Sequence, residues 1–106
     1  MSSLNALAFR LEPGTQLVDG IKEFVAKSQL QAAFIMTCVG SLQSCTIRLA
    51  HADRLNRNPV KSFEEKMEIL SLVGTMSPQG VHLHISLGIH VNNLSLSLSL
   101  SLLRYD

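Results

Sequence analysis

The spacing of apolar residues changes near residue 15, and the two spacings predict different elements. Residues Leu4–Leu11 alternate over short intervals and predict a first strand, which the turn signal Pro13-Gly14 ends. From Thr15 the apolar residues recur at the spacing of one helix face, which predicts a helix over Thr15–Gln29 with Thr15 as its N-cap. The residues of that face are Leu17, Val18, Ile21, Phe24 and Val25.

Two segments in the middle of the chain predict a first hairpin. Ala32–Val39 is a continuous apolar run that is too short for a typical helix and ends at Gly40-Ser41, which favours a buried strand. Cys45–His51 alternates with period two and predicts the partner strand. The charged and polar residues 53–66 that follow predict a surface loop, since they include Asn58-Pro59.

A second hairpin is predicted in Met67–Leu87, which reads MEILSLVGTMSPQGVHLHISL. Met67–Met76 and Val81–Leu87 have strand character and flank the four residues Ser77–Gly80. These four place Pro and Gly at central and last positions of a common turn type. We therefore expect two paired strands here.

The last residues have a composition unlike the rest. From Asn93 the chain reads NLSLSLSLSLLRYD, in which Leu and Ser alternate with period two. This period is that of an amphipathic strand. The same alternation is also what a CT dinucleotide repeat encodes when translated, so we expect a domain over residues 1–92 followed by a low-complexity tail over residues 93–106.

The length of 106 residues indicates one domain, because a chain of this size buries roughly two-thirds of its unfolded surface. The predicted fold is α+β, with an antiparallel or mixed sheet of about five strands, an estimate from the strand patterns. The helix is expected to pack on one face of that sheet.

Charge and cysteine spacing narrow the classes of function. A net charge of +1 with 16% charged residues gives no basic stripe, so autonomous nucleic-acid binding has little electrostatic support. Cys38 and Cys45 have neither redox nor zinc-motif spacing and are predicted to be buried thiols. We expect no secretory signal and no membrane span, and hence an intracellular protein, cytoplasmic or nuclear.

Two histidines carry the clearest candidate chemistry. His82 and His84 have the same parity, so on a strand they project from one face about 7 Å apart and can share zinc or another divalent metal. Zinc takes three or four protein ligands, so the pair leaves the shell incomplete. A third ligand could come from His90, His51, Cys38, Cys45 or Glu68, or from another subunit. The alternative is that both histidines are polar residues of a solvated or interface face.

Three charged residues form a second candidate group. Arg10, Glu12 and Glu68 either line a small anion or carboxylate pocket with the histidines or form ion pairs between strands or subunits, and the structural role is favoured. No catalytic residue is predicted, because Ser41 and Ser71 lack a nucleophile-elbow motif and the common nucleotide-binding loops are absent from the sequence.

The segment Met67–Leu87 resembles the PPC domain, the plant and prokaryote conserved domain, whose pattern has EILSL-G-T, a turn and HLH in this order. Arg10, the LEPG of Leu11–Gly14 and the VGSL of Val39–Leu42 also fall where that family has equivalents. The resemblance covers residues 6–87 and implies a homotrimer. Plant relatives that bind DNA carry AT-hook segments, which this sequence lacks.

In bacterial members the HLH pair and a later Gly-Gly-His histidine look like a three-histidine site. The resemblance carries over only to His82 and His84, because the Gly-Gly-His segment and the family's last strand have no match here. We therefore expect a truncated or alternatively spliced form of the domain.

Three functions remain open at this point. The favoured one is a non-enzymatic, oligomeric interaction module of the PPC type. The second is a metal-binding protein that uses the histidine pair, and the third is a DNA-associated regulator as in plant relatives.

Overall fold

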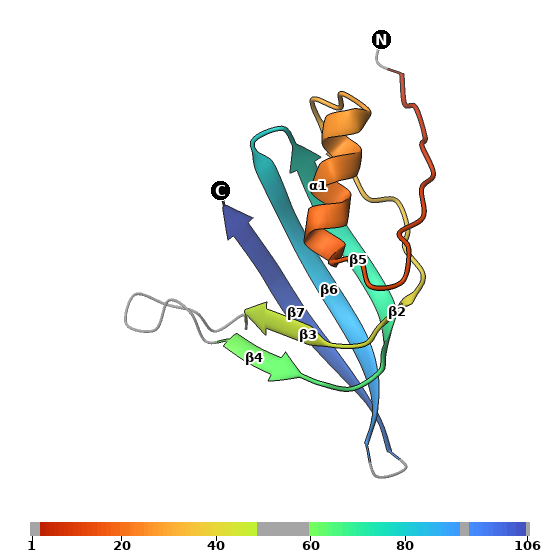
Figure 1. Cartoon of the computed structure of the whole chain (residues 1–106), viewed down its shortest axis with the longest axis vertical. Helices are drawn as coiled ribbons and strands as arrows, with labels where there is room; N and C mark the ends of the chain where they lie inside the picture. Colours follow the sequence, from red (N-terminus) through yellow and green to blue (C-terminus); the bar gives the residue numbers. More distant parts are fainter. Residues whose placement is uncertain (1–2, 49–59, 92–93, 106) are drawn as a thin grey trace.

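One sheet and one helix make up the computed structural model, which describes residues 3–48, 60–91 and 94–105 (Figure 1). The described elements are α1 (Leu17–Lys27), β1 (Ala33–Phe34), β2 (Ser41–Leu42), β3 (Cys45–Arg48), β4 (Val60–Phe63), β5 (Met67–Ser77), β6 (Gly80–Val91) and β7 (Leu94–Tyr105). Every strand pairing is antiparallel, in the order β1-β5-β6-β7-β3-β4, and β2 also pairs with β5. The α+β prediction is confirmed, with seven strands where about five were expected.

Helix α1 buries the stripe that the sequence predicted. Val18, Ile21 and Val25 are 2–3% exposed and pack against the sheet. The N-cap is Gln16 rather than Thr15, because the Gln16 Oε1 accepts a hydrogen bond from the Asp19 N–H at 2.8 Å. The Thr15 N–H instead donates to the Glu12 carbonyl, which makes Thr15 part of the preceding turn.

The predicted first strand is wrong, because residues 3–12 have no strand structure and run beside α1 (Figure 1). Phe9 stacks on Phe24 of the helix with ring centroids 3.9 Å apart. Leu11 lies so close to Gly20 that a Cβ there would meet the Leu11 side chain at 2.8 Å. The apolar residues of this segment therefore pack on the helix instead of pairing in the sheet.

The predicted hairpin of β5 and β6 is confirmed and forms the centre of the sheet. The strands pair from Ser77↔Gly80 to Met67↔Ile89, with a register shift between Ile69 and Ser71. Side chains alternate along β6, so that one set is buried against α1 and the other set faces away from it. The buried set is Val81, Leu83, Ile85, Leu87 and Ile89.

The predicted hairpin of Ala32–Val39 with Cys45–His51 is wrong. β1 pairs with β5 at Ala33↔Met76, whereas β3 pairs with β4 at Cys45↔Phe63. The start of the apolar run therefore pairs with the edge of β5 and not with β3. β4 lies within the segment that was predicted to be a loop. Residues 49–59, which include the end of the predicted strand and most of the predicted loop, lie outside the described residues.

Strand β7 places the Leu-Ser alternation inside the sheet. It pairs with β6 from Gly80↔Tyr105 to Val91↔Leu94, and its Leu positions from 96 to 102 are in register with buried positions of β6. β3 reaches the sheet through the pair Arg48↔Ser101. Residues 94–105 therefore form a strand, and the low-complexity origin of the alternation stays a prediction.

The described residues include no helix with the length and apolarity needed to cross a membrane.

Candidate functional site

The histidine pair lies on the sheet face that points away from α1. His82 and His84 alternate with Leu83 and Ile85, which are 0% and 1% exposed, whereas His84 is exposed and His82 half-buried. Across β5 the register partners are Thr75 for His82 and Val73 for His84. The prediction that both imidazoles share one face is therefore confirmed.

The two rings meet at their outer nitrogens. The His82 Nε2 and the His84 Nε2 are 3.0 Å apart, and the ring centroids are 4.9 Å apart with planes tilted by 50°. The rotamers thus bring the two Nε2 atoms much closer together than the distance of about 7 Å that separates alternate residues along a strand. At 3.0 Å one Nε2–H can donate to the other Nε2, or both lone pairs can point at one cation.

The separation of the two nitrogens fits a shared metal ion. Two ligands in a tetrahedral zinc site with zinc–nitrogen bonds of 2.0–2.1 Å lie about 3.3 Å apart, which is close to what the pair already has. No group of three or more His, Cys, Asp or Glu side chains suited to a metal occurs among the residues that the structure describes. Of the alternative third ligands, His51 lies outside that part of the chain and the side chain of His90 is not described.

Gly74 allows β5 to approach β6 at the site. Its φ of +150° is one that L side chains rarely adopt, and a Cβ there would lie 2.0 Å from the His82 carbonyl oxygen. The same glycine is the G of the EILSL-G-T pattern. Sequence reasoning gave this residue no role, although a glycine inside a strand is a signal for close backbone approach.

Half-exposed apolar side chains surround the pair. Val73 is 50% exposed beside His84, and Phe34 is 53% exposed in register with Thr75, in the same row as His82. Leu70, 55% exposed, lies over Gly88 on this face, since a Cβ at Gly88 would be 3.4 Å from its side chain. Among the side chains that the structure describes, the near neighbours of the histidines are therefore uncharged and partly apolar.

The second candidate group is spread over the chain. Arg10 and Glu12 belong to the exposed segment before α1, whereas Glu68 is on β5 opposite Gly88. Within residues 3–48, 60–91 and 94–105, no hydrogen bond or ion pair joins these three residues to one another or to the histidines. A pocket shared by all of them stays a prediction.

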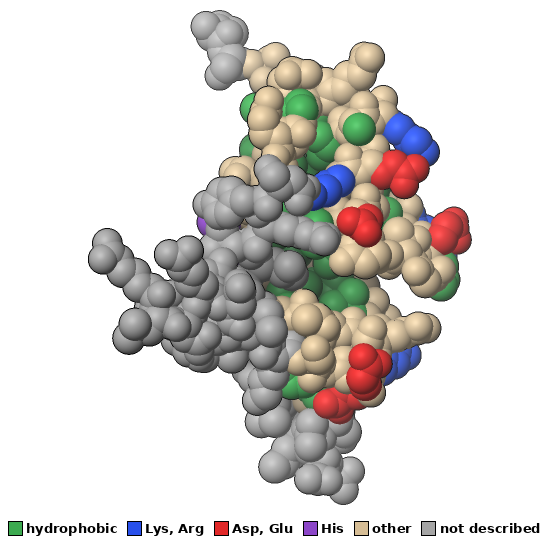
Figure 2. Space-filling view, turned by 60° about the vertical axis from the view of Figure 1, so that its left-hand side comes forward, with side chains coloured by type: hydrophobic (Ala, Val, Ile, Leu, Met, Phe, Trp, Pro, Cys, Tyr) green, Lys and Arg blue, Asp and Glu red, His purple; other side chains and the backbone are tan. Residues whose placement is uncertain are grey.

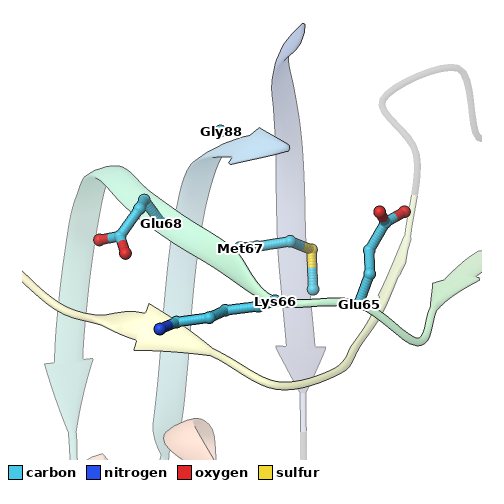
Figure 3. A pocket seen from close by; sticks show the side chains of 5 residues that line it. All are labelled: Glu65, Lys66, Met67, Glu68 and Gly88. Carbon is cyan, nitrogen blue, oxygen red and sulfur yellow. The ribbon is translucent and has the colours of Figure 1, made fainter. Parts of the chain in front are cut away.

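Glu68 lines an open hollow of about 500 Å³ at the other end of the β5–β6 hairpin (Figure 3). Its other lining residues are Glu65, Lys66, Met67 and Gly88. Figure 3 shows Lys66 extending to the same side as Glu68, while Glu65 points to the opposite side. The hollow does not include His82 or His84, so the hollow and the candidate metal ligands are separate features.

The two cysteines are half-buried free thiols. Burial raises the pKa of both Cys38 and Cys45, because an apolar surrounding disfavours the thiolate.

Among the charged side chains of the described residues, acidic and basic groups lie close together in the view of Figure 2, and histidine atoms reach the surface at its left-hand margin.

The fold and the HLH strand define a family, and comparison with known proteins supplies its identity. Residues 1–93 match the Plants and Prokaryotes Conserved (PCC) domain, so the chain belongs to this family. Two curated relatives, each named bifunctional protein GlmU and from two Synechococcus strains, are 38% identical over 85 and 87 residues. The match covers 80% of this chain but 13% of each relative, so the chain spans only a small part of their length.

Two solved structures have the same fold. A hypothetical protein from Salmonella enterica superimposes with a TM-score of 0.72 at 29% identity, covering 92% of this chain and 68% of that protein. A metal-containing protein from Archaeoglobus fulgidus gives a TM-score of 0.67 at 26% identity, covering 97% of this chain and 79% of that protein. The PPC-like fold is therefore established.

Proposed function

We propose that this PCC domain is a divalent-metal-binding interaction module in which His82 and His84 are metal ligands. The observation that carries the proposal is the 3.0 Å separation of the two Nε2 atoms on an exposed strand. The similar protein from Archaeoglobus fulgidus is described as metal-containing, which supports the same role for this chain.

A bound zinc ion would act as a cross-link between the two imidazoles. Neutral imidazole ligates through an unprotonated nitrogen, so the ring whose Nε2–H donates in the hydrogen-bonded pair would carry that proton on Nδ1 when zinc is bound. The strand supplies the orientation, since Leu83 between the histidines is fully buried and fixes which way both side chains project. Binding is therefore expected to weaken in acid, where protons compete with the metal.

The interaction role rests on the surroundings of the pair. Phe34, Leu70 and Val73 are each at least 50% exposed on the histidine face, and apolar side chains gathered on one face are typical of contact surfaces. The proposal assigns no catalytic residue. A homotrimer and an association with DNA stay predictions, and DNA binding would appear as a mobility shift of duplex DNA that weakens with salt.

Metal analysis tests the proposal. The chain is stripped with chelator, reloaded with zinc, desalted and measured for zinc by mass spectrometry, beside His82→Ala and His84→Ala. We expect bound zinc in the wild type and roughly tenfold less zinc in either variant, because each substitution removes one of the two proposed imidazole ligands.

Thr75→Val is the matched control for these variants. It changes the register partner of His82 on the same face without removing an imidazole, and it should keep the metal. Circular dichroism checks that each variant is folded. Zinc content that is equal in the wild type and in both folded histidine variants would contradict the assignment of the ligands.

A further inference from the structure

We propose that a single divalent ion bridges two copies of this chain, each of which donates His82 and His84. The inference rests on the proposed function and adds the source of the remaining ligands.

The number of ligands that zinc requires is the reason to consider a second copy of the chain. A structural zinc site has four protein ligands, and the pair with Nε2 atoms 3.0 Å apart provides two of them. A two-fold axis through the ion would bring the same pair from another copy and complete a shell of four imidazoles. Such an isologous contact needs no further residue type, because each copy offers the same surface.

The described residues next to the histidines carry no charge that would repel the same surface of a second copy. In a two-fold contact the residues near the axis meet their own copies, so a charged side chain there would face a like charge. The register partners Thr75 and Val73 are neutral, and so is Ser86 on the same face of β6. Glu68 is an acidic residue on this face. It pairs with Gly88, farther along the hairpin than the pair Ser71↔Ser86, so it lies away from the axis.

Side-chain size also allows the approach. Packed sheets lie about 10 Å apart, and the space between them must be filled by side chains of both faces. The described neighbours Thr75, Val73 and Ser86 have side chains shorter than an imidazole, so they leave room for the rings of a second copy. The half-exposed Val73, Leu70 and Phe34 would lose water contact around the ion, which adds apolar burial to the metal bonds.

The experiment is light scattering coupled to size exclusion, with zinc analysis of the same peak. It uses the full chain, first stripped with chelator and then with added zinc. Whatever assembly forms without metal, the expected result is that zinc doubles its mass at 0.5 zinc per chain. His82→Ala and His84→Ala should abolish the doubling, and Thr75→Val should keep it.

The outcomes separate this inference from the proposed function. One zinc per chain with unchanged mass would overturn the bridge and leave the histidine site intact, with its remaining ligands from the same chain or water. A doubling at one zinc per chain would also overturn a shared ion. No bound zinc in a folded chain would overturn both proposals. If an alanine variant is not folded, His82→Gln and His84→Gln take its place, and doubling that persists in them would overturn the bridge.

Discussion

At the residue scale, Gly74 is the position where backbone geometry and the candidate site depend on each other most directly. Any side chain at this position would need both a φ of +150° and space that the His82 carbonyl oxygen occupies, 2.0 Å from a Cβ. The backbone strain alone costs about 1–3 kcal/mol. The neighbouring carbonyl cannot move away without breaking the pairing of Gly74 with Leu83.

We therefore expect Gly74→Ala to lower the free energy of unfolding by at least ~2 kcal/mol, measured by urea denaturation. The matched control is Gly88→Ala on β6, where φ is ordinary and the nearest atom to a Cβ is the flexible Leu70 side chain at 3.4 Å. This control should change stability by less than about 1 kcal/mol, the range of a strand propensity. Equal effects of the two substitutions would contradict the close approach at Gly74.

The two thiols give a prediction for alkaline pH. Because burial raises the pKa of Cys38 and Cys45 above the ordinary 9.0, the folded chain holds these protons to higher pH than the unfolded chain does. The resulting stability is complete below the ordinary pKa and is lost as the pH rises through the raised values.

The measurement is the urea midpoint between pH 8 and pH 10.5, beside a Cys38→Ala, Cys45→Ala double variant. The wild type should lose stability more steeply than the variant in this window. Parallel curves would show that the thiols do not titrate differently in the folded and unfolded chain.

At the element scale, the sequence predicted those elements whose signals are local. The helix has its own apolar stripe, and β5 and β6 are joined by a short turn that sets their register, so α1 and the central hairpin were predictable. The pairing of β1 with β5 and of β3 with β4 depends on partners distant in the chain, and no local pattern selects them. The N-terminal segment alternates like a strand, but its Phe9 stacks on Phe24 of the helix, so the segment packs on α1 and does not join the sheet.

The same distinction applies to the candidate site. Parity along β6 was enough to place His82 and His84 on one face. Their Nε2 separation of 3.0 Å depends on rotamers, and the contribution of Gly74 depends on how closely β5 crosses the His82 carbonyl. Neither is encoded in the spacing of residues, so the sequence could name the candidate ligands but not their geometry.

At the scale of the whole molecule, β7 connects two parts of the sheet. It covers one edge of β6 along its length, and β3 with β4 is attached through the pair Arg48↔Ser101. Ile47 of β3 is 1% exposed and belongs to the same buried cluster as Leu83 and Ile85. Without β7, the order of the sheet leaves β3 and β4 paired with each other but with no other neighbour among the described strands.

A chain that ends at residue 92 should therefore lose stability and associate with itself. Its β6 would present unpaired N–H and C=O groups along an edge whose side chains are largely apolar, which is a template for pairing with another chain. The urea midpoint should fall, and size exclusion should show species larger than those of the full chain at the same concentration.

The matched control replaces residues 93–106 with a Gly-Ser tail of equal length, which keeps the chain length but not the strand propensity. It should behave like the shortened chain, since the lost property is the pairing of β7 with β6 and not the mere presence of a tail. If both shortened and substituted chains instead keep the urea midpoint and elution of the full chain, the domain ends at residue 92, as its sequence pattern predicts. In that event the stability of β3 and β4 must come from α1 and the central hairpin, because β7 would contribute nothing to it.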